Sequence, residues 1–471
     1  MININKILDF IGKTPIARRL INGAIWTGVG TIVAKGLTVV ASFCVARFCG
    51  KTEFGEYGMV INTATMLATV CGMGMGTTVV KYVAECKESN PERAGRILAM
   101  ATFLTWGMAI VLGIVFLVLA DVIACRIIAA PHLAPLLRVA ALGVILGIFN
   151  EVQLASLTGC EAYKERAKIS ICSGIVQSVM LILCSWLWGL KGAVIAFSIA
   201  ALITIALTAI LMMPIWKRYG LQRRFKGMSK EWKVLVGFSL PTILLLLLGF
   251  PVSWFIRTLL TKIPDGYDHL AIINAAAPWG MLVAFLVTTI GTALVPVLSD
   301  IIGKGEKERA LRLTWKMFWL NAVIVVPICI VICVCAPLIL KVYGKGFETG
   351  LFAFCLIALA NGLGTIYQPM WNFLVGAGMM WTNFLVVFLT AIIQIVLGFC
   401  FVSFGAEGLA AVSLLITLLR LIVLVILFKW VIPIYGFRCN GVSMVSYMMS
   451  LNIILICEDI LSLSGDIKCI L

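Results

Sequence analysis

The sequence predicts an all-α integral membrane protein with about twelve transmembrane helices, arranged as two six-helix lobes. Three observations predict this fold class. The 471 residues are 62% hydrophobic and only 12% charged, whereas about a quarter of the residues in a soluble protein are charged. The apolar residues occur in runs of about twenty, the length that crosses roughly 30 Å of hydrocarbon. Basic residues are concentrated in alternate loops, which is typical of multi-pass membrane proteins.

The expected helices follow the apolar runs in chain order. They lie near 22–47, 57–80, 97–119, 135–157, 168–187, 192–214, 234–258, 270–297, 317–339, 351–374, 383–403 and 406–429. The first run is too long for a signal peptide and lacks a small-residue cleavage pattern, so we expect it to be a span.

These spans predict five parts of the chain. They are a cytoplasmic N-terminal segment (1–21), an N-terminal six-helix lobe (22–216), a basic cytoplasmic connector (217–233), a C-terminal six-helix lobe (234–430) and a C-terminal tail (431–471). The apolar part of the tail is short for a span, and acidic residues follow it. This pattern favours an interfacial helix over a thirteenth span.

The distribution of charge predicts the orientation and limits the partners. Most of the 37 lysines and arginines fall in one set of alternate loops, which places both termini in the cytoplasm. Basic loops beside anionic lipid account for the net charge of +16 without a nucleic-acid partner. The 16 cysteines lie mostly inside helices and there are only two histidines. We therefore expect no metal site and no cofactor.

An internal repeat relates the two predicted lobes. Gly76-Thr77-Thr78-Val79 matches Gly291-Thr292-Ala293-Leu294, and Glu92-Arg93-Ala94 matches Glu308-Arg309-Ala310 at nearly the same offset. Both copies leave the second helix of their half on the same predicted side. A parallel repeat about an axis along the membrane normal is expected; chance similarity of two amphipathic loops is the alternative.

The turn Gly50-Lys51-Thr52-Glu53-Phe54-Gly55-Glu56-Tyr57-Gly58 and the Glu-Arg-Ala loop carry a family resemblance. With the two-lobe layout over residues 15–435, they resemble the polysaccharide (O-antigen type) repeat-unit flippases of the multidrug/oligosaccharidyl-lipid/polysaccharide exporter superfamily. The resemblance implies transport of a polyprenyl-diphosphate-linked oligosaccharide from the inner to the outer leaflet of the cell inner membrane by alternating access. It also implies a role in surface polysaccharide or lipopolysaccharide assembly, with membrane lipids and other assembly proteins as partners.

Ionisable residues within spans are costly and are therefore candidate site residues. Lys35 lies midway along the first span, and we expect it to line a central aqueous cleft and contact the diphosphate. A structural ion pair with Glu151 is the alternative. Arg420 is too deep in the last span to reach the interface easily, which favours the bundle interior. Arg257 would either line the cleft or extend to the interface.

Amide side chains form a second group of candidates for the substrate cleft. They are Asn62, Asn150, Asn274, Gln368 and Asn372. Such amides could hydrogen-bond to sugar hydroxyls, but they also serve as ordinary contacts between membrane helices.

Glycines and prolines mark candidate hinges. Gly72, Gly74 and Gly76 lie near the end of the second span, and Pro241 and Pro251 lie in the seventh. Proline removes a backbone hydrogen bond and bends a helix, which suits a lobe that rocks. The alternative is that both residue types are simply common in membrane helices.

Three other functions remain to be weighed. A cation-coupled multidrug exporter normally needs a buried carboxylate of adjustable pKa, and Glu151 is the only acid well inside the predicted spans. A membrane enzyme is disfavoured because the outer loops are short and hold no acid/base cluster, and no phosphate-binding P-loop occurs. A peptidoglycan-precursor flippase of the same superfamily remains open, although fourteen helices would favour it.

Overall fold

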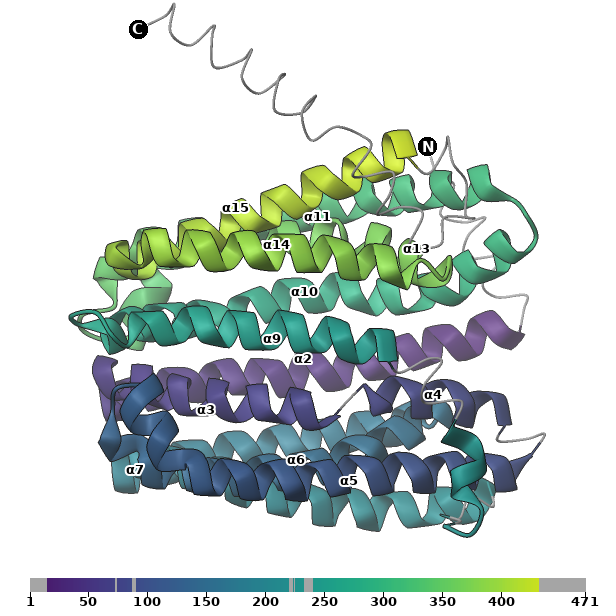
Figure 1. Ribbon diagram of the computed structural model, residues 1–471, viewed down its shortest axis with the longest axis horizontal. Helices are drawn as coiled ribbons and strands as arrows, with labels where there is room; N and C mark the ends of the chain where they lie inside the picture. Colours follow the sequence, from purple (N-terminus) through teal and green to yellow (C-terminus); the bar gives the residue numbers. More distant parts are fainter. Residues whose placement is uncertain are drawn as a thin grey trace, which may run out of the picture.

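The computed structural model describes residues 15–72, 74–86, 90–219, 223, 225–232 and 240–431. This part of the chain is built of helices and contains no β-strand, so the predicted all-α class is confirmed. Helices α2 to α7 form one group and helices α9 to α15 form a second group. Where the two groups meet, α2 and α3 of the first pack against α9 and α10 of the second (Figure 1). The N-terminal segment up to residue 14 and the tail from residue 432 lie outside the described residues.

The first group holds six α-helices in the described ranges. They are α2 (Pro15–Cys49), α3 (Lys51–Gly72), α4 (Met75–Cys86), α5 (Pro91–Val122), α6 (Ala134–Gly159) and α7 (Tyr163–Tyr219). Inside α7, Gly189 has φ 56° and ψ −136°. This non-helical residue separates the predicted spans 168–187 and 192–214.

The second group holds seven α-helices in the described ranges. They are α9 (Leu240–Leu260), α10 (Gly266–Gly303), α11 (Lys307–Tyr343), α12 (Leu351–Ile366), α13 (Gln368–Gly376), α14 (Met380–Phe401) and α15 (Gly405–Ile426). Short 3-10 or π turns occupy Ile123–Ile127, Pro131–Leu133, Met228–Glu231, Glu348–Gly350, Val402–Phe404 and Leu427–Val431.

Each predicted span overlaps one or more helices over its described residues, but the number of crossings stays a prediction. Seven helical stretches of the described chain are long and apolar enough to cross a membrane. Two of them, Tyr163–Arg218 with 56 residues and Trp381–Lys429 with 49, exceed twice the ~20 residues that one crossing needs. Large apolar side chains also face outward, as Val118 (71% exposed) and Val334 (73% exposed) illustrate. Such a surface is typical of a protein embedded in lipid.

A glycine cluster marks a break between α3 and α4. α3 ends at Gly72, and Gly74 has φ +62°, a left-handed conformation that glycine adopts at little cost. α10, the counterpart in the second half, is continuous, so the break is not repeated. Of the other hinge candidates, Pro251 lies inside α9 and Pro241 is the second residue of α9 as described. Their role as hinges stays a prediction.

The two groups of helices meet closely where α3 passes α10. A Cβ atom on Gly55 would lie 1.9 Å from the carbonyl oxygen of Tyr267, and one on Gly58 would lie 1.7 Å from Nδ2 of Asn274. Only hydrogen in place of a side chain permits these approaches. Two glycines of the Gly50–Gly58 turn therefore allow α3 to pack directly against α10.

Polar contacts join the groups at the end of the bundle where α2 ends and α10 begins, at the left in Figure 1. Arg47 Nε donates to the carbonyl oxygen of Val342 over 2.8 Å. Thr52 Oγ1 donates to Asp268 Oδ1 over 2.6 Å, and Lys51 Nζ lies 3.6 Å from Asp268 Oδ2. We call this end the predicted outer end, because the positive-inside pattern assigns it to the outside. The two groups are thus packed together at the predicted outer end.

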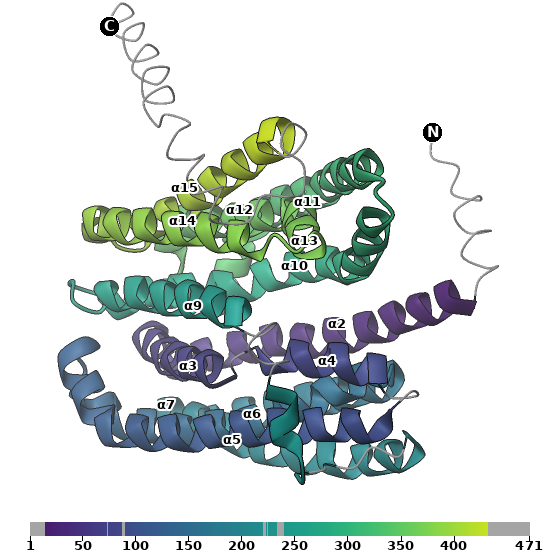
Figure 2. The same ribbon diagram turned by 45° about the vertical axis from the view of Figure 1, so that its right-hand side comes forward.

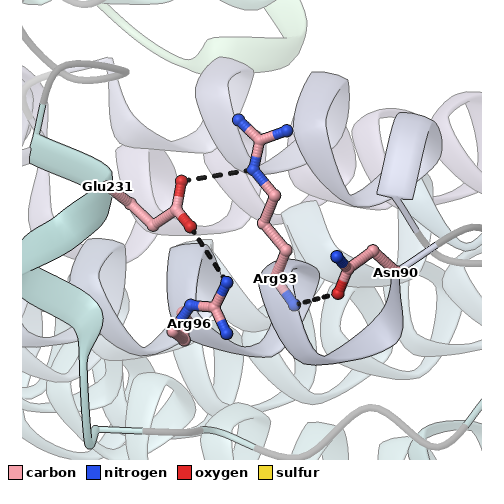
Figure 3. Close-up of polar contacts among 4 residues, drawn as sticks. All are labelled: Asn90, Arg93, Arg96 and Glu231. Atoms are coloured by element: carbon pink, nitrogen blue, oxygen red, sulfur yellow. Dashed lines mark hydrogen bonds and ion pairs between the residues drawn. The ribbon is translucent and has the colours of Figure 1, made fainter.

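The turn Met228–Glu231, which lies between the two halves in the sequence, contacts the start of α5 (Figure 3). Glu231, in the turn Met228–Glu231, is 7% exposed and accepts hydrogen bonds from Arg93 and Arg96, each over 3.3 Å. Asn90 caps α5 by accepting from the backbone N–H of Arg93 over 3.0 Å. Figure 2 shows this turn lying beside α5, away from the second group of helices.

The matching arginines of the second half have different partners. Arg309 donates to Glu306 over 2.8 Å, and Arg312 lies 4.0 Å from Glu308. Both arginines therefore pair with a carboxylate at the start of α11. The repeat seen in the sequence therefore does not extend to the ion pairs. A superposition of the halves about an axis normal to the membrane stays a prediction.

Candidate functional site

A cavity of about 650 Å³ lies inside the second group of helices and is lined by α9, α10, α12, α14 and α15, with Trp371 of α13. Small residues on these helices leave its volume open, among them Gly249, Ala277, Gly280, Ala360 and Ala410. The cavity lies within the second half of the protein. The central cleft expected from the sequence stays a prediction.

Two sequence-predicted cations, Arg257 of α9 and Arg420 of α15, line this cavity. Its lining also carries the polar side chains of Asn361, Gln394, Ser413 and Thr417 but, among the described residues, no aspartate or glutamate. Two guanidinium groups without a lining carboxylate give the cavity a positive charge. Such an arrangement is costly in a membrane interior unless an anion or water offsets it.

Arg257 connects the cavity to the interface between the two groups. Its Nη1 donates to Oδ1 of Asn274 on α10 over 3.2 Å, and Nδ2 of Asn62 on α3 donates to the same oxygen over 3.2 Å. Three sequence-predicted candidates from three helices therefore form one hydrogen-bonded set. Of the two options for Arg257, this structure places it at the cavity.

Arg420 is half-buried and is held by one neighbour. Its Nε donates to Oγ1 of Thr390 on α14 over 2.9 Å. A guanidinium has five N–H donors in a planar fork, so donors remain that can bind a ligand in the cavity. Arg420 thus lies in the bundle interior, where the sequence analysis expected it.

Lys35 lies at the edge of the same region. It extends from α2, its side chain is exposed, and its Nζ is 4.0 Å from Sδ of Met281, a residue that lines the cavity. The alternative partner, Glu151, lies elsewhere: its carboxylate would be 3.1 Å from a Cβ on Gly72, at the break between α3 and α4. The described structure shows no Lys35–Glu151 ion pair.

The remaining amide candidates lie apart from the cavity. Asn150 is buried in α6, in the first half, with 6% of its surface exposed. Gln368 and Asn372 of α13 face each other, with 3.4 Å between Nε2 and Oδ1, and adjoin Asn321 of α11. These residues occupy two other places in the fold, and a role in a substrate site stays a prediction for each.

Several polar cavity residues escaped the sequence analysis. Ser413 and Thr417 are two of them, and with the predicted Arg420 they occupy positions i, i+4 and i+7 of α15. That spacing puts them on one face of a helix, so a polar stripe was visible in the sequence. Asn361 and Gln394 gave a weaker signal, because within its apolar helix each has one polar residue at this spacing, a threonine four positions away.

The arrangement suits binding of an anion attached to a polar, uncharged group. Guanidinium forks form paired, charge-assisted hydrogen bonds with phosphate oxygens. Amide and hydroxyl side chains such as those of Asn361, Gln394 and Ser413 both donate and accept, as sugar hydroxyls require. A volume of 650 Å³ falls within the ~300–1,000 Å³ that ligand sites commonly have.

Comparison with known proteins places the chain among membrane transporters. A family model described as "Polysaccharide biosynthesis protein" matches residues 20–302, and the MatE model matches residues 239–399. The EPS I polysaccharide export inner membrane protein EpsE of Ralstonia nicotianae is 22% identical over 396 residues, which cover 83% of this chain and 89% of that protein. The lipid III flippase of Escherichia coli is 22% identical over 62% of this chain and 70% of its own length.

Solved structures show the same fold. A transporter of the MOP superfamily from Pyrococcus furiosus, described as having a binding pocket of reverse polarity, superposes with a TM-score of 0.69 at 16% identity and covers 90% of this chain and 96% of that chain. An inward-facing multidrug resistance MATE family transporter gives a TM-score of 0.67 at 14% identity, over 88% of this chain and 100% of that chain.

These relatives export or flip their substrates and are not enzymes, which agrees with the expectation from the short loops. The fold is that of the MOP transporters, and the first family model covers more than half of the sequence. This multi-pass membrane protein therefore belongs to the polysaccharide biosynthesis protein family and is a transporter.

Proposed function

We propose that this transporter moves a polyprenyl-diphosphate-linked oligosaccharide repeat unit from the inner to the outer leaflet of the cytoplasmic membrane, for surface polysaccharide assembly. The observation that carries the proposal is the cavity lined by Arg257 and Arg420 without an acidic lining residue among those described. A polysaccharide exporter and a lipid III flippase are among the relatives, and both names are compatible with a lipid-linked saccharide substrate here.

In this proposal the two arginines hold the diphosphate, and the amides and hydroxyls of the cavity meet the first sugars. An anion offsets the cost of two cations in a membrane interior, and each guanidinium can form two parallel hydrogen bonds with it. Lys35 adds a third positive charge beside Met281. Its exposed position suits an early contact with the diphosphate as the substrate enters from the lipid.

A cation-coupled drug exporter fits the site less well. The one acid that the sequence places well inside the spans, Glu151, lies in the first half beside the α3–α4 break, not in the cavity. A positively charged drug would meet Arg257 and Arg420 with no carboxylate to offset them. The polarity of the cavity therefore favours an anionic substrate.

We further propose the membrane arrangement that the sequence predicts: lobes at 22–216 and 234–430, a cytoplasmic connector at 217–233 and both termini in the cytoplasm. Labelling of single introduced cysteines in a background without native cysteines tests it. Positions Arg224 and Lys307 should react only from the cytoplasm, and Lys191 and Lys345 only from outside. Finding Arg224 and Lys345 on the same side would overturn the twelve-helix topology.

The transport proposal is testable in vesicles that contain the purified full-length protein. A polyprenyl diphosphate carrying a fluorescent oligosaccharide is placed in both leaflets, and its movement is followed by quenching from one side. Wild type should exchange the substrate between leaflets, while Arg257→Ala and Arg420→Ala should slow exchange at least tenfold. Arg312→Ala, which removes an exposed arginine of α11, is the control and should match wild type.

Two outcomes would overturn the proposal. One is wild-type protein that does not move the lipid-linked oligosaccharide, and the other is Arg257→Ala and Arg420→Ala variants that move it at the wild-type rate. A parallel arm with a polyprenyl diphosphate bearing a peptidoglycan precursor addresses the remaining alternative. Faster movement of that lipid would reassign the sugar class while leaving the diphosphate site intact.

A further inference from the structure

Asn274 lies at the junction between the cavity and the contact that joins the two groups of helices. Its Oδ1 accepts from Arg257 Nη1 on the cavity side and from Asn62 Nδ2 of α3 on the other side, each over 3.2 Å. Gly58 leaves the space that its side chain fills, since a Cβ there would be 1.7 Å from Asn274 Nδ2. One amide therefore contacts a cavity cation and the opposite half of the protein.

The orientation of this amide depends on Arg257. A guanidinium can only donate, so it requires the oxygen of Asn274 and not the nitrogen. That orientation leaves Asn274 Nδ2 buried without a hydrogen-bond partner in the described structure. A buried N–H group without a partner is unfavourable, so the arrangement persists because Oδ1 receives two donors at once.

We propose that Asn274 is a positioning residue that couples capture of the substrate diphosphate by Arg257 to release of the α3–α10 contact. The proposal rests on the function proposed above, because it needs an anion in the cavity. Neither the cavity alone nor the interface alone predicts this coupling; it follows from the oxygen atom that Arg257 and Asn62 share.

The physical sequence has two steps. A phosphate oxygen competes with the Asn274 amide for Arg257, and a phosphate offers the guanidinium an opposite charge and two parallel hydrogen bonds, whereas the amide offers one neutral oxygen. Once Arg257 donates to the phosphate, Asn274 accepts only the hydrogen bond from Asn62. This single bond must then offset the unfavourable burial of the unpaired Asn274 N–H group. Nothing then fixes the amide orientation, and the bond between Asn62 and Asn274 is weakened.

A second contact lies on the same path. Trp254, one turn before Arg257 on α9, donates from Nε1 to Oγ1 of Thr63 over 2.9 Å. Thr63 is next to Asn62 on α3. A shift of α9 toward a bound anion therefore acts on neighbouring residues of α3 through both Trp254 and Asn274, so the cavity and the interface move together.

The test measures opening at the predicted outer end of the full-length protein in vesicles. Spin labels are attached through clickable amino acids at Lys191 and Glu348, which are exposed and belong to opposite halves; this avoids the native cysteines. The probe is farnesyl diphosphate, a short isoprenyl diphosphate, and farnesol is the control for its apolar chain. Binding of each probe is measured separately by calorimetry.

In wild type, farnesyl diphosphate should raise the open-to-closed ratio about threefold, as expected for weakening one interhelical hydrogen bond in a membrane protein, and farnesol should not. Asn274→Ala should be shifted toward the open state without a probe and should show no further response, while still binding farnesyl diphosphate. Asn62→Ala, which leaves Asn274 and Arg257 in place, should behave likewise and covers the case in which Asn274→Ala does not fold.

Thr65→Ala is the matched control. Thr65 is one turn from Asn62 on α3, and its hydroxyl donates to the carbonyl oxygen of Ile61 in its own helix, so the variant should respond as wild type does. If farnesyl diphosphate binds to wild type without changing the label distance, the proposed coupling is wrong but the proposed anion site stands. A full wild-type response in both asparagine variants would do the same, whereas absence of binding in wild type would overturn the anion site as well.

Discussion

Replacing Gly55 with alanine should shift the transporter away from the state that is packed at the predicted outer end. The new Cβ would lie 1.9 Å from the carbonyl oxygen of Tyr267, whereas ordinary contacts begin at 3.4 Å, so α3 and α10 would have to separate by about 1.5 Å. The opposing atom belongs to the backbone and cannot rotate aside. Overpacking of this kind costs about 1–3 kcal/mol. Since about 1.4 kcal/mol is a factor of ten, the ratio of closed to open protein should fall roughly 5- to 150-fold.

The assay is the distance distribution between labels at Lys191 and Glu348, measured for wild type and Gly55→Ala together with transport in vesicles. Gly107→Ala is the control, because a Cβ on Gly107 of α5 would meet no atom within 4 Å. Gly55→Ala should populate the long distance and transport slowly, and Gly107→Ala should match wild type. A folded Gly55→Ala protein with the wild-type distance distribution and transport rate would show that the α3–α10 contact does not control opening.

Three further outcomes are expected. Arg420→Ala should lower the transport rate at least tenfold. Thr390→Val removes the hydroxyl that accepts from Arg420 and leaves the guanidinium in place, so it should lower the transport rate less, by the equivalent of about 0.5–1.5 kcal/mol. Equal transport rates in the two variants would argue against a role for the Arg420 charge. Lys35→Ala should abolish surface polysaccharide at normal protein levels and Lys35→Arg should partly restore it, while wild-type output from the alanine variant would remove this lysine from the mechanism. Glu231→Gln should speed protease cleavage of the connector because it removes the carboxylate shared by two arginines, unlike Glu306→Gln at an exposed pair; equal cleavage rates would contradict this view of the connector.

The fold was predictable from sequence because the membrane imposes a strong and simple constraint. Each span must satisfy its backbone internally over about twenty apolar residues, and each predicted span overlaps helix over the residues that the structure describes. The glycine cluster at Gly72 and Gly74 also signalled the break between α3 and α4. The asymmetry was not predictable: the repeat suggested equivalent halves, yet α10 runs unbroken where α3 and α4 are separate.

The candidate site was predictable in part. Desolvation cost singled out Arg257 and Arg420, and the structure brings both to one cavity. It does not bring Gln368 there, although this amide looked as suitable as any other. The same reasoning passed over Ser413 and Thr417. The desolvation cost of a charged residue in a span is visible in the sequence. Whether a neutral polar residue faces a cavity depends on which helices pack together, and the sequence does not show this.

The glycine turn that carried the family resemblance had no assigned role in the sequence. The structure gives one to Gly55 and Gly58, which allow α3 to approach Tyr267 and Asn274. The reason for a glycine at these positions becomes clear only when the residue packed against it is known. That residue lies more than 200 positions away in the chain. Sequence reasoning about one helix could not supply it.

The chemistry of Arg257 limits which substrates could drive opening through Asn274. An anionic head group competes for the guanidinium, frees the amide and weakens its contact with Asn62. A cationic drug in the same cavity would be repelled by Arg257 and Arg420 and would leave the Arg257–Asn274 bond in place. A ligand shifts a conformational equilibrium only through a difference in its interaction with the two states. In the proposed mechanism an anion has such a difference and a cation does not, so the residues that we propose to hold a diphosphate would also make opening selective for it.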